Sequence, residues 1–423
     1  MLIQKISSAG EIRLKKNSLR DGNIISTVAS IISDVTKNGD KALKKLTAKF
    51  DKAVLKNIEV DEKELCDAVT SIAAKHKSLF RRIISNIEKY QANTIIKSWE
   101  KNFGDGAELG EIITPVESAG LYIPGGTAPL ISSVFMSAVP AYMAGVKNIY
   151  ICTPPDKNGK INPYILVAAK MCKVKKIFKI GGAQAIAAMA YGTQTVPKVD
   201  KIIGPGNIFV TLAKKAVYGE VDIDMIAGPS EILVYADESS VPEYVAADLI
   251  SQAEHDTLAS SYLVTTSEKL AEEVSGIIRK NIKELPRHKI IDESIKNNMR
   301  IFIVKNSVVA IDVINKIAPE HLELCIKSPK TQLRKIKNAG AIFIGNFTPE
   351  PVGDYYAGPS HILPTAGTAK YYSPVSINTF FKRTSVINYS EEKLKNSALD
   401  IIEIAELEQL RAHANAIRVR IKS

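Results

Sequence analysis

The chain has 423 residues, of which 45% are hydrophobic and 24% are charged, a composition typical of a globular protein with two or three domains. No apolar run approaches the roughly 20 residues that span a bilayer, and residues 1–5 do not open a secretory signal, so we expect a cytoplasmic protein without membrane contact. The four cysteines form no Cys-x-x-Cys pair, so we expect no disulfides. The net charge of +11 raises the possibility of nucleic-acid binding, but the lysines are spread along the chain, so we favour a solvated surface and expect no nucleic-acid partner.

Residues 1–115 are predicted to be mostly helical. Apolar residues recur at helical spacing from Ile24 to Val35, and Gly39 with Asp40 is expected to end that helix. This region has no evident chemistry, so we interpret it as packing.

From about residue 117, short apolar runs alternate with helix patterns, which predicts parallel sheets covered by helices on both faces. A first series of strands is expected at 120–123, 148–152, 176–180 and 201–203. The helices that belong to this series are expected near 128–144, 163–172, 184–190 and 207–217. A second series of strands is expected at 232–235, 262–264, 300–304, 321–326 and 341–344. Two α/β domains of similar size are the economical interpretation.

A long polar stretch, rich in Gly, Pro and Tyr, extends over residues 345–372. A loop of that length inside a compact enzyme is usually functional. Residues 391–420 are predicted to be helical.

Three glycine-rich turns each follow a predicted strand and open a predicted helix. They contain Gly125-Gly126, Gly181-Gly182 and Gly204-Pro205-Gly206. Such turns let backbone N–H groups approach an anionic ligand at a helix N-terminus, and turns of one parallel sheet meet at the carboxyl ends of its strands. A nucleotide is the ligand we expect, although no Gly-x-Gly-x-x-Gly occurs and plain turn chemistry explains the glycines about as well.

Gln252 and His255 lie three positions apart at the end of a predicted helix and so share one face. With Asp354 and His413 they would supply two nitrogens and two oxygens, a set suited to Zn²⁺, or to Mn²⁺ or Co²⁺ in its place. The alternative interpretation is structural: Gln252 and His255 line a helix face, and His413 lies on the surface.

Glu320 and His321 stand next to each other at the start of a predicted strand. An acid and an imidazole in this position suit proton abstraction and water activation. An ion pair in a loop is the competing interpretation. Cys325 follows on the same strand, where it is expected to point inward as a small hydrophobic residue.

The sequence resembles the histidinol dehydrogenases from about residue 20 to residue 420. The matching segments are Gly120–Gly126, Gly181–Ile186, Ile203–Asn207, Ala227–Glu231, Gln252–Asp256, Ala318–Leu322, Gly353-Asp354, Ser360–Thr365 and Ala412-His413. The resemblance implies an α/β fold with two incomplete Rossmann-like, three-layer, parallel-sheet domains and small helical extensions, in an intertwined homodimer. The domains would be 1–22 as an N-terminal extension, 23–120 with 231–372 for metal and substrate, 121–230 for NAD, and 373–423 as a helical dimerisation segment.

The resemblance also implies the activity, which is two NAD-dependent oxidations that convert L-histidinol through L-histidinal to L-histidine. One Zn²⁺ per active site would be held by Gln252, His255, Asp354 and His413, and the catalytic bases would be Glu320 and His321. The substrate contacts would be the four metal ligands together with Ser230, His321, His361 and Glu408. The NAD contacts would be Tyr122, Gln184 and Asn207. His413 and Glu408 would complete the active site of the neighbouring subunit.

Two features qualify this resemblance. Ser118 stands where many family members carry an arginine. Glu408 and His413 are five positions apart, about 140° around an ideal helix, so a helix start or a bend is expected between them. Three rival functions are an aldehyde-dehydrogenase-like enzyme with Cys325 as nucleophile, a zinc hydrolase that uses Glu320, and a nucleic-acid-binding protein.

Overall fold

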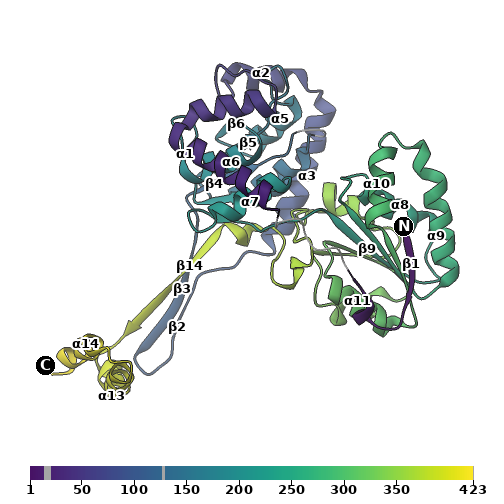
Figure 1. The fold of residues 1–423 in the computed structure, drawn as a ribbon. Coiled ribbons are helices and arrows are strands. Elements are labelled where there is room, and N and C mark those ends of the chain that lie inside the picture. The colour runs from purple at the N-terminus through teal and green to yellow at the C-terminus, as the bar shows by residue number, and fades with distance from the viewer. Residues whose placement is uncertain (14–20, 126–128, 423) are drawn as a thin grey trace. The chain divides into compact units, whose positions relative to one another are not determined.

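The computed structural model describes residues 1–13, 21–125 and 129–422. The chain divides into two compact units (Figure 1). The first unit comprises residues 1–94 and 117–380, and the second comprises residues 95–116 and 381–423. Within the described residues, no helix combines the length and the apolar character needed to cross a membrane.

The first unit contains a six-stranded parallel sheet in the order β1-β11-β10-β9-β12-β13. Its strands are β1 (Leu2–Ile6), β9 (Glu231–Ala236), β10 (Ser260–Thr265), β11 (Arg300–Val304), β12 (His321–Cys325) and β13 (Ala341–Ile344). The five strands expected in the second series are therefore confirmed. β1 is an addition, because residues 1–22 were expected to form only an extension.

Helices cover both faces of this sheet (Figure 1). On one face, α8, α9 and α10 pack against Ile232, Val234 and Leu263. On the other face, α11 packs against Leu233 and Tyr235. These helices are α8 (Pro242–Ala253), α9 (Glu268–Asn281), α10 (His288–Asn298) and α11 (Ser307–Ile317). Alternate residues of β9 therefore face two different cores, which explains its unbroken run of buried residues.

A five-stranded parallel sheet, in the order β6-β5-β4-β7-β8, also belongs to the first unit. Its strands are β4 (Ser118–Tyr122), β5 (Asn148–Thr153), β6 (Lys176–Lys179), β7 (Lys201–Ile203) and β8 (Asp222–Ile223). Its expected helices are confirmed as α4 (Ile131–Ala144), α5 (Pro163–Met171), α6 (Gly182–Tyr191) and α7 (Ile208–Val217). The predicted domain boundary at residues 120/121 falls inside β4.

Helix α1 (Gly22–Phe50) belongs to the core of the five-stranded sheet. Its buried face, which includes Val28, Ile31 and Val35, packs with α6 and α7. The prediction grouped residues 23–120 with the other sheet, whereas the buried residues of this helix that the structure describes belong to the core of the five-stranded sheet. The remaining helices of this region are α2 (Glu62–Ser71) and α3 (Ala74–Ala92).

The helix end predicted at Gly39 is a kink, after which α1 continues to Phe50. Gly39 has φ +49° and ψ −131°, and a Cβ there would lie 2.3 Å from the Gln194 side chain. The Asp40 carboxylate accepts hydrogen bonds from the hydroxyls of Thr193 and Thr195. Glycine is favoured at Gly39 both by the positive φ and by the lack of space.

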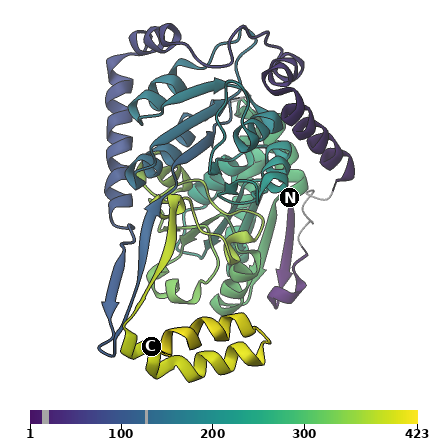
Figure 2. The same ribbon diagram turned by 90° about the vertical axis from the view of Figure 1, so that its left-hand side faces the viewer.

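The second unit contains a three-stranded antiparallel sheet and a helical hairpin (Figures 1 and 2). Its elements are β2 (Trp99–Asn102), β3 (Ala107–Pro115), β14 (Phe381–Tyr389), α13 (Glu391–Leu407) and α14 (Arg411–Ile421). Helices α1 to α3 agree with the prediction of a mostly helical region up to residue 115, but the strands β2 and β3 were not predicted, and β14 lies in a segment expected to be helical. The two C-terminal helices are confirmed.

The break between α13 and α14 falls where the sequence required one. Gln409, with φ +62°, separates Glu408 at the end of α13 from the start of α14. The predicted interruption between Glu408 and His413 is therefore confirmed.

Candidate active site

The catalytic candidates lie in a buried cluster of carboxylates and imidazoles in the first unit. His321, the first residue of β12, is at its centre. Its Nδ1 lies 3.7 Å from a carboxylate oxygen of Glu320 and 3.7 Å from one of Glu350. Its Nε2 lies 3.5 Å from a carboxylate oxygen of Asp354. One imidazole is thus surrounded by three acids.

The start of β9 anchors both Glu320 and His321. The backbone N–H of Glu231 donates to Oε2 of Glu320 at 2.9 Å, and Nδ1 of His321 lies 3.2 Å from the carbonyl oxygen of Glu231. Glu320 and His321 do form an ion pair, as the competing interpretation has it, and both of its side chains are buried. Ser230, the half-buried residue before β9, is bonded through its carbonyl oxygen to the N–H of Ser260 at 3.0 Å.

The electrostatic environment shifts the pKa of both catalytic candidates upwards. Burial raises the pKa of Glu320 to about 8, against the opposing charge of His321. Burial by itself would lower the pKa of His321, but Glu320, Glu350 and Asp354 outweigh it and raise the pKa to about 10. Nε2 of His321 is buried and has no hydrogen-bond partner among the described residues. Such an orphaned atom is typical of a position that a ligand fills.

Three side chains could hold a metal ion next to this imidazole. One ligand atom from each of His255, Glu350 and Asp354 lies within 4.8 Å of the others. Gln252, at the end of α8, is fully buried. When its amide nitrogen is turned towards Glu350, it donates to the two carboxylate oxygens at 3.0 and 3.2 Å. The tertiary structure therefore brings Gln252, His255 and Asp354 to one place.

Glu350 is a functional candidate that the sequence reasoning missed. It stands four positions before Asp354, in a helical turn that continues into a π-helical turn at Gly353–Ala357. That i, i+4 spacing within the long polar stretch was the available signal. Its backbone N–H donates to the Glu323 carboxylate at 2.8 Å, which fixes the start of the turn. π-helical turns are frequent at functional sites.

His361 adjoins the same cluster. Its Nδ1 lies 3.1 Å from the carbonyl oxygen of Asp354, and its Nε2 lies 3.2 Å from the hydroxyl of Ser133 on α4. Burial lowers its pKa. His361 is therefore a neutral imidazole whose orientation is set from both ring nitrogens.

His413 and Glu408 belong to the second unit. His413 is exposed on α14, and Glu408 is exposed at the end of α13. Their assignment as a metal ligand and a substrate contact stays a prediction.

Two of the three glycine turns, those of Gly182 and Gly204, meet at Tyr122 at the end of β4. The backbone N–H of Gly182 donates to the Tyr122 hydroxyl at 3.1 Å. Gly204 has φ +128°, and a Cβ there would lie 2.1 Å from the carbonyl oxygen of Tyr122. Residues 126–128 of the first turn lie outside the described residues.

The two other predicted NAD contacts flank these turns. Gln184 is buried in the first turn of α6. Asn207 caps α7, since its side chain accepts the N–H groups of Phe209 and Val210. This cap accounts for Asn207 structurally, and its contact with a cofactor stays a prediction.

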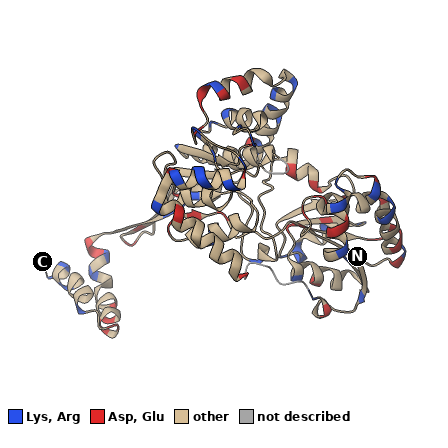
Figure 3. Ribbon diagram, turned by 45° about the horizontal axis from the view of Figure 1, so that its top comes forward, with Lys and Arg blue, Asp and Glu red and all other residues tan. Residues whose placement is uncertain are grey.

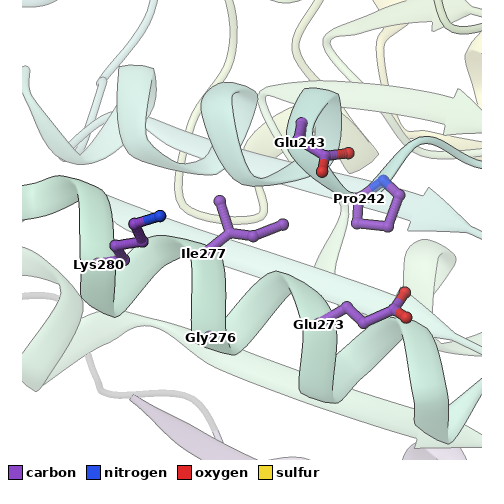
Figure 4. Close-up of a pocket in the computed structure, with 6 residues that line it drawn as sticks. All are labelled: Pro242, Glu243, Glu273, Gly276, Ile277 and Lys280. Atoms are coloured by element: carbon purple, nitrogen blue, oxygen red, sulfur yellow. The ribbon is translucent and has the colours of Figure 1, made fainter.

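Two further features lie apart from the cluster. Cys325 occupies the end of β12 opposite to His321, and burial raises the pKa of its thiol well above the usual range. Figure 4 shows a pocket lined by Pro242, Glu243, Glu273, Gly276, Ile277 and Lys280, on α8 and α9. None of these residues belongs to the cluster.

Comparison with known proteins identifies the family. The family model for histidinol dehydrogenase matches residues 14–421. The chain is 49% identical to histidinol dehydrogenase of Clostridium acetobutylicum, over 100% of this chain and 99% of that protein, and 48% identical to the Bacillus subtilis enzyme, over 99% of each. The crystal structure of histidinol dehydrogenase from Elizabethkingia anophelis superposes with a TM-score of 0.93 at 39% identity, covering 100% of this chain and 98% of that one. The chain therefore belongs to the histidinol dehydrogenase family and is an oxidoreductase.

Proposed function

We propose that this protein oxidises L-histidinol through L-histidinal to L-histidine, with two NAD molecules and one Zn²⁺ per active site. The observation that carries the proposal is the position of buried Glu320 and His321 beside the donor group of His255, Glu350 and Asp354. The substrate has to be held by its nitrogens, which a cation bound to these ligands can do. It also has to lose a proton in each of two oxidations, and Glu320 and His321 are two groups that can accept one.

The donors fit a zinc ion. His255 and Asp354 offer a nitrogen and an oxygen, Gln252 would add an amide oxygen, and the partner subunit's His413 would add a second nitrogen. When bound, Zn²⁺ orients the amino and imidazole nitrogens of the substrate, and its charge lowers the pKa of the nearby His321.

In the first oxidation, His321 accepts the proton of the substrate hydroxyl. The surrounding carboxylates of Glu320 and Asp354 stabilise the imidazolium that forms. The turns around Tyr122, Gln184 and Asn207 would hold NAD, which would accept the hydride from the same carbon. The product of this step is L-histidinal.

In the second oxidation, Glu320 takes a proton from a water molecule as its oxygen adds to the aldehyde carbon. The His321 imidazolium formed in the first oxidation returns its proton to the aldehyde oxygen, which completes the gem-diol. A second NAD would accept the hydride from the gem-diol carbon, while His321 takes a proton from one hydroxyl as the carboxyl group forms. Burial keeps the pKa of Glu320 at about 8, which suits a base at neutral pH. No thioester to a cysteine is required.

The composition of the second unit supports a homodimer. Among its described residues, the buried apolar side chains are four alanines (Ala107, Ala398, Ala405 and Ala414). Large apolar side chains are exposed instead, and they include Trp99, Phe103, Ile387, Leu399, Ile404, Leu407 and Val419. A core of this size cannot stabilise the unit by itself, and exposed apolar groups of this number are typical of an interface. A second copy of the chain is the partner we propose.

The surface charge is consistent with a small-molecule enzyme. Figure 3 shows lysines and arginines interspersed with acidic residues on many helices. A mixed surface of this kind favours solubility, and an anionic cofactor would be attracted by the net positive charge.

Removal of the metal tests the proposed site. We expect NADH formation from L-histidinol to fall to background after dialysis against a chelator and to return when one equivalent of Zn²⁺ is added, because the substrate would no longer be oriented. The measurement is absorbance at the NADH wavelength, with metal content determined on the same samples. Full activity in metal-free protein would contradict the ligand assignment, and a zinc hydrolase would form no NADH at all.

Replacement of Cys325 by Ala separates the proposed mechanism from a cysteine-based aldehyde oxidation. We expect near-normal oxidation of L-histidinal and a loss of about 1 kcal/mol in the free energy of unfolding, because a small buried side chain is shortened. The measurements are kcat with L-histidinal and denaturant unfolding. Complete loss of aldehyde oxidation in a folded variant would favour the rival.

A further inference from the structure

A buried ion pair holds the third glycine turn of the five-stranded sheet. Lys214 on α7 pairs with Asp224, which follows β8, and their side chains are 3% and 1% exposed. Lys214 Nζ also donates to the carbonyl oxygen of Gly204 at 2.9 Å. Oδ2 of Asp224 accepts the N–H of Gly204 at 2.8 Å. The pair therefore occupies both backbone polar groups of one glycine.

Gly204 connects this pair with Tyr122 and, through Tyr122, with the turn at Gly182. Its backbone lies against the carbonyl oxygen of Tyr122, at a distance that admits no side chain. The hydroxyl of Tyr122 in turn accepts the N–H of Gly182 at the start of α6. A displacement of Gly204 would thus reach the N-terminal end of α6, which has no side-chain cap and where an anion would be stabilised.

Stability alone does not explain the two charges. A buried ion pair loses hydration that its attraction only partly restores, so apolar residues of similar volume are often as stabilising. A glycine in a left-handed conformation has no side chain by which the core could hold it, and two charged hydrogen bonds to its backbone replace that contact.

We propose that Lys214 and Asp224 are positioning residues for the cofactor, which hold the Gly204 turn in the geometry that binds the pyrophosphate of NAD. This inference rests on the proposed function, since it takes NAD to be the ligand of the turns. Neither residue needs to touch NAD, because both act through Gly204.

The double variant Lys214→Met with Asp224→Asn tests the proposal. It removes the ion pair without leaving a lone buried charge, and the asparagine can still accept the N–H of Gly204. We expect the Kd for NAD to rise about tenfold, the effect of one lost charged hydrogen bond. The KM for L-histidinol and the zinc content should remain as in the wild-type protein. The measurements are equilibrium NAD binding to the zinc-loaded protein, steady-state kinetics and metal analysis.

A matched control lies on the same strands. Lys201 and Asp222 form an ion pair of 2.6 Å at the beginning of β7 and β8, the ends opposite to the turn. Lys201→Met with Asp222→Asn makes the same chemical change and should leave the Kd for NAD unaltered. An equal loss of NAD affinity in both double variants would show a general effect of the domain and would overturn the proposal.

Two further outcomes are informative. Wild-type NAD affinity in the folded Lys214→Met/Asp224→Asn variant would overturn the positioning role while leaving the proposed function intact. Failure of the wild-type protein to bind NAD would overturn both. If this double variant does not fold, Lys214→Gln with Asp224→Asn decides by the same measurement, because the two amides keep a donor and an acceptor for Gly204 without a lone buried charge. A smaller increase in the Kd for NAD is then expected, and no increase would overturn the inference.

Discussion

Replacement of Glu320 by Gln should stop the oxidation of L-histidinal while the oxidation of L-histidinol to the aldehyde continues. Gln keeps the acceptor for the Glu231 N–H but cannot take a proton from water. A general base contributes about 100-fold to 10,000-fold, so kcat with L-histidinal should fall within that range. NADH formation measured separately with L-histidinol and L-histidinal would show the difference, with about one NADH per L-histidinol consumed instead of two.

The pH dependence follows from the same group. Burial raises the pKa of Glu320 to about 8, and only the ionised form acts as a base. The rate with L-histidinal should therefore rise as the pH increases through about 8 and fall below it.

Glu323 provides the control for this variant. It lies three residues further along, on β12, and burial together with Asp248 raises the pKa of its side chain to about 9, so it is neutral at pH 7. Glu323→Gln then replaces a neutral carboxyl with a neutral amide whose oxygen can still accept the N–H of Glu350, so it should leave both oxidations largely unchanged. Equal losses of both half-reactions in Glu320→Gln would contradict the assignment of Glu320 to the second step.

His255→Ala and His413→Ala should each be inactive alone, and activity should return when the two variants are mixed so that dimers with one subunit of each form. If each active site takes His413 from the partner subunit, a mixed dimer has one site that lacks both residues and one intact site. Random mixing makes half of the dimers mixed, so about a quarter of the wild-type activity should return. The measurement is NADH formation from L-histidinol after co-refolding of the two variants in zinc-containing buffer, with bound zinc determined in parallel.

A mixture of His255→Ala with Asp354→Ala is the matched control. Both residues belong to the first unit, and their ligand atoms lie within 4.8 Å of each other in one chain, so each site of a mixed dimer still lacks one of them. No activity should return. Recovery in this control, or an active His413→Ala protein by itself, would exclude the shared site.

The parallel sheets could be predicted because their signal is local. Strands such as β9 and β12 are buried on both faces, and this burial requires short continuous apolar runs that are visible in the sequence. The antiparallel ribbon of β3 and β14 was missed, because β3 is mostly half-buried, β14 is largely exposed, and the paired residues lie about 270 positions apart in the chain. Its pairing has no local periodicity by which it could be found.

The kink at Gly39 shows which part of a helix break can be predicted from neighbouring residues and which part depends on distant contacts. The sequence marked the correct residue as a break, since glycine favours conformations outside the helix. Contacts with Gln194 and the hydroxyls of Thr193 and Thr195 decide that the chain resumes a helix afterwards. Those partners are more than 150 positions away.

The chemical types at the site were determined by the sequence itself. Gln252 with His255, and Glu320 with His321, are close in the chain, and helix or strand geometry keeps each pair together. Only the tertiary structure decided that these pairs meet, that Glu350 joins them, and that three carboxylates surround one imidazole. The pKa of a buried group depends on charges brought close by folding, and that information is absent from sequence spacing.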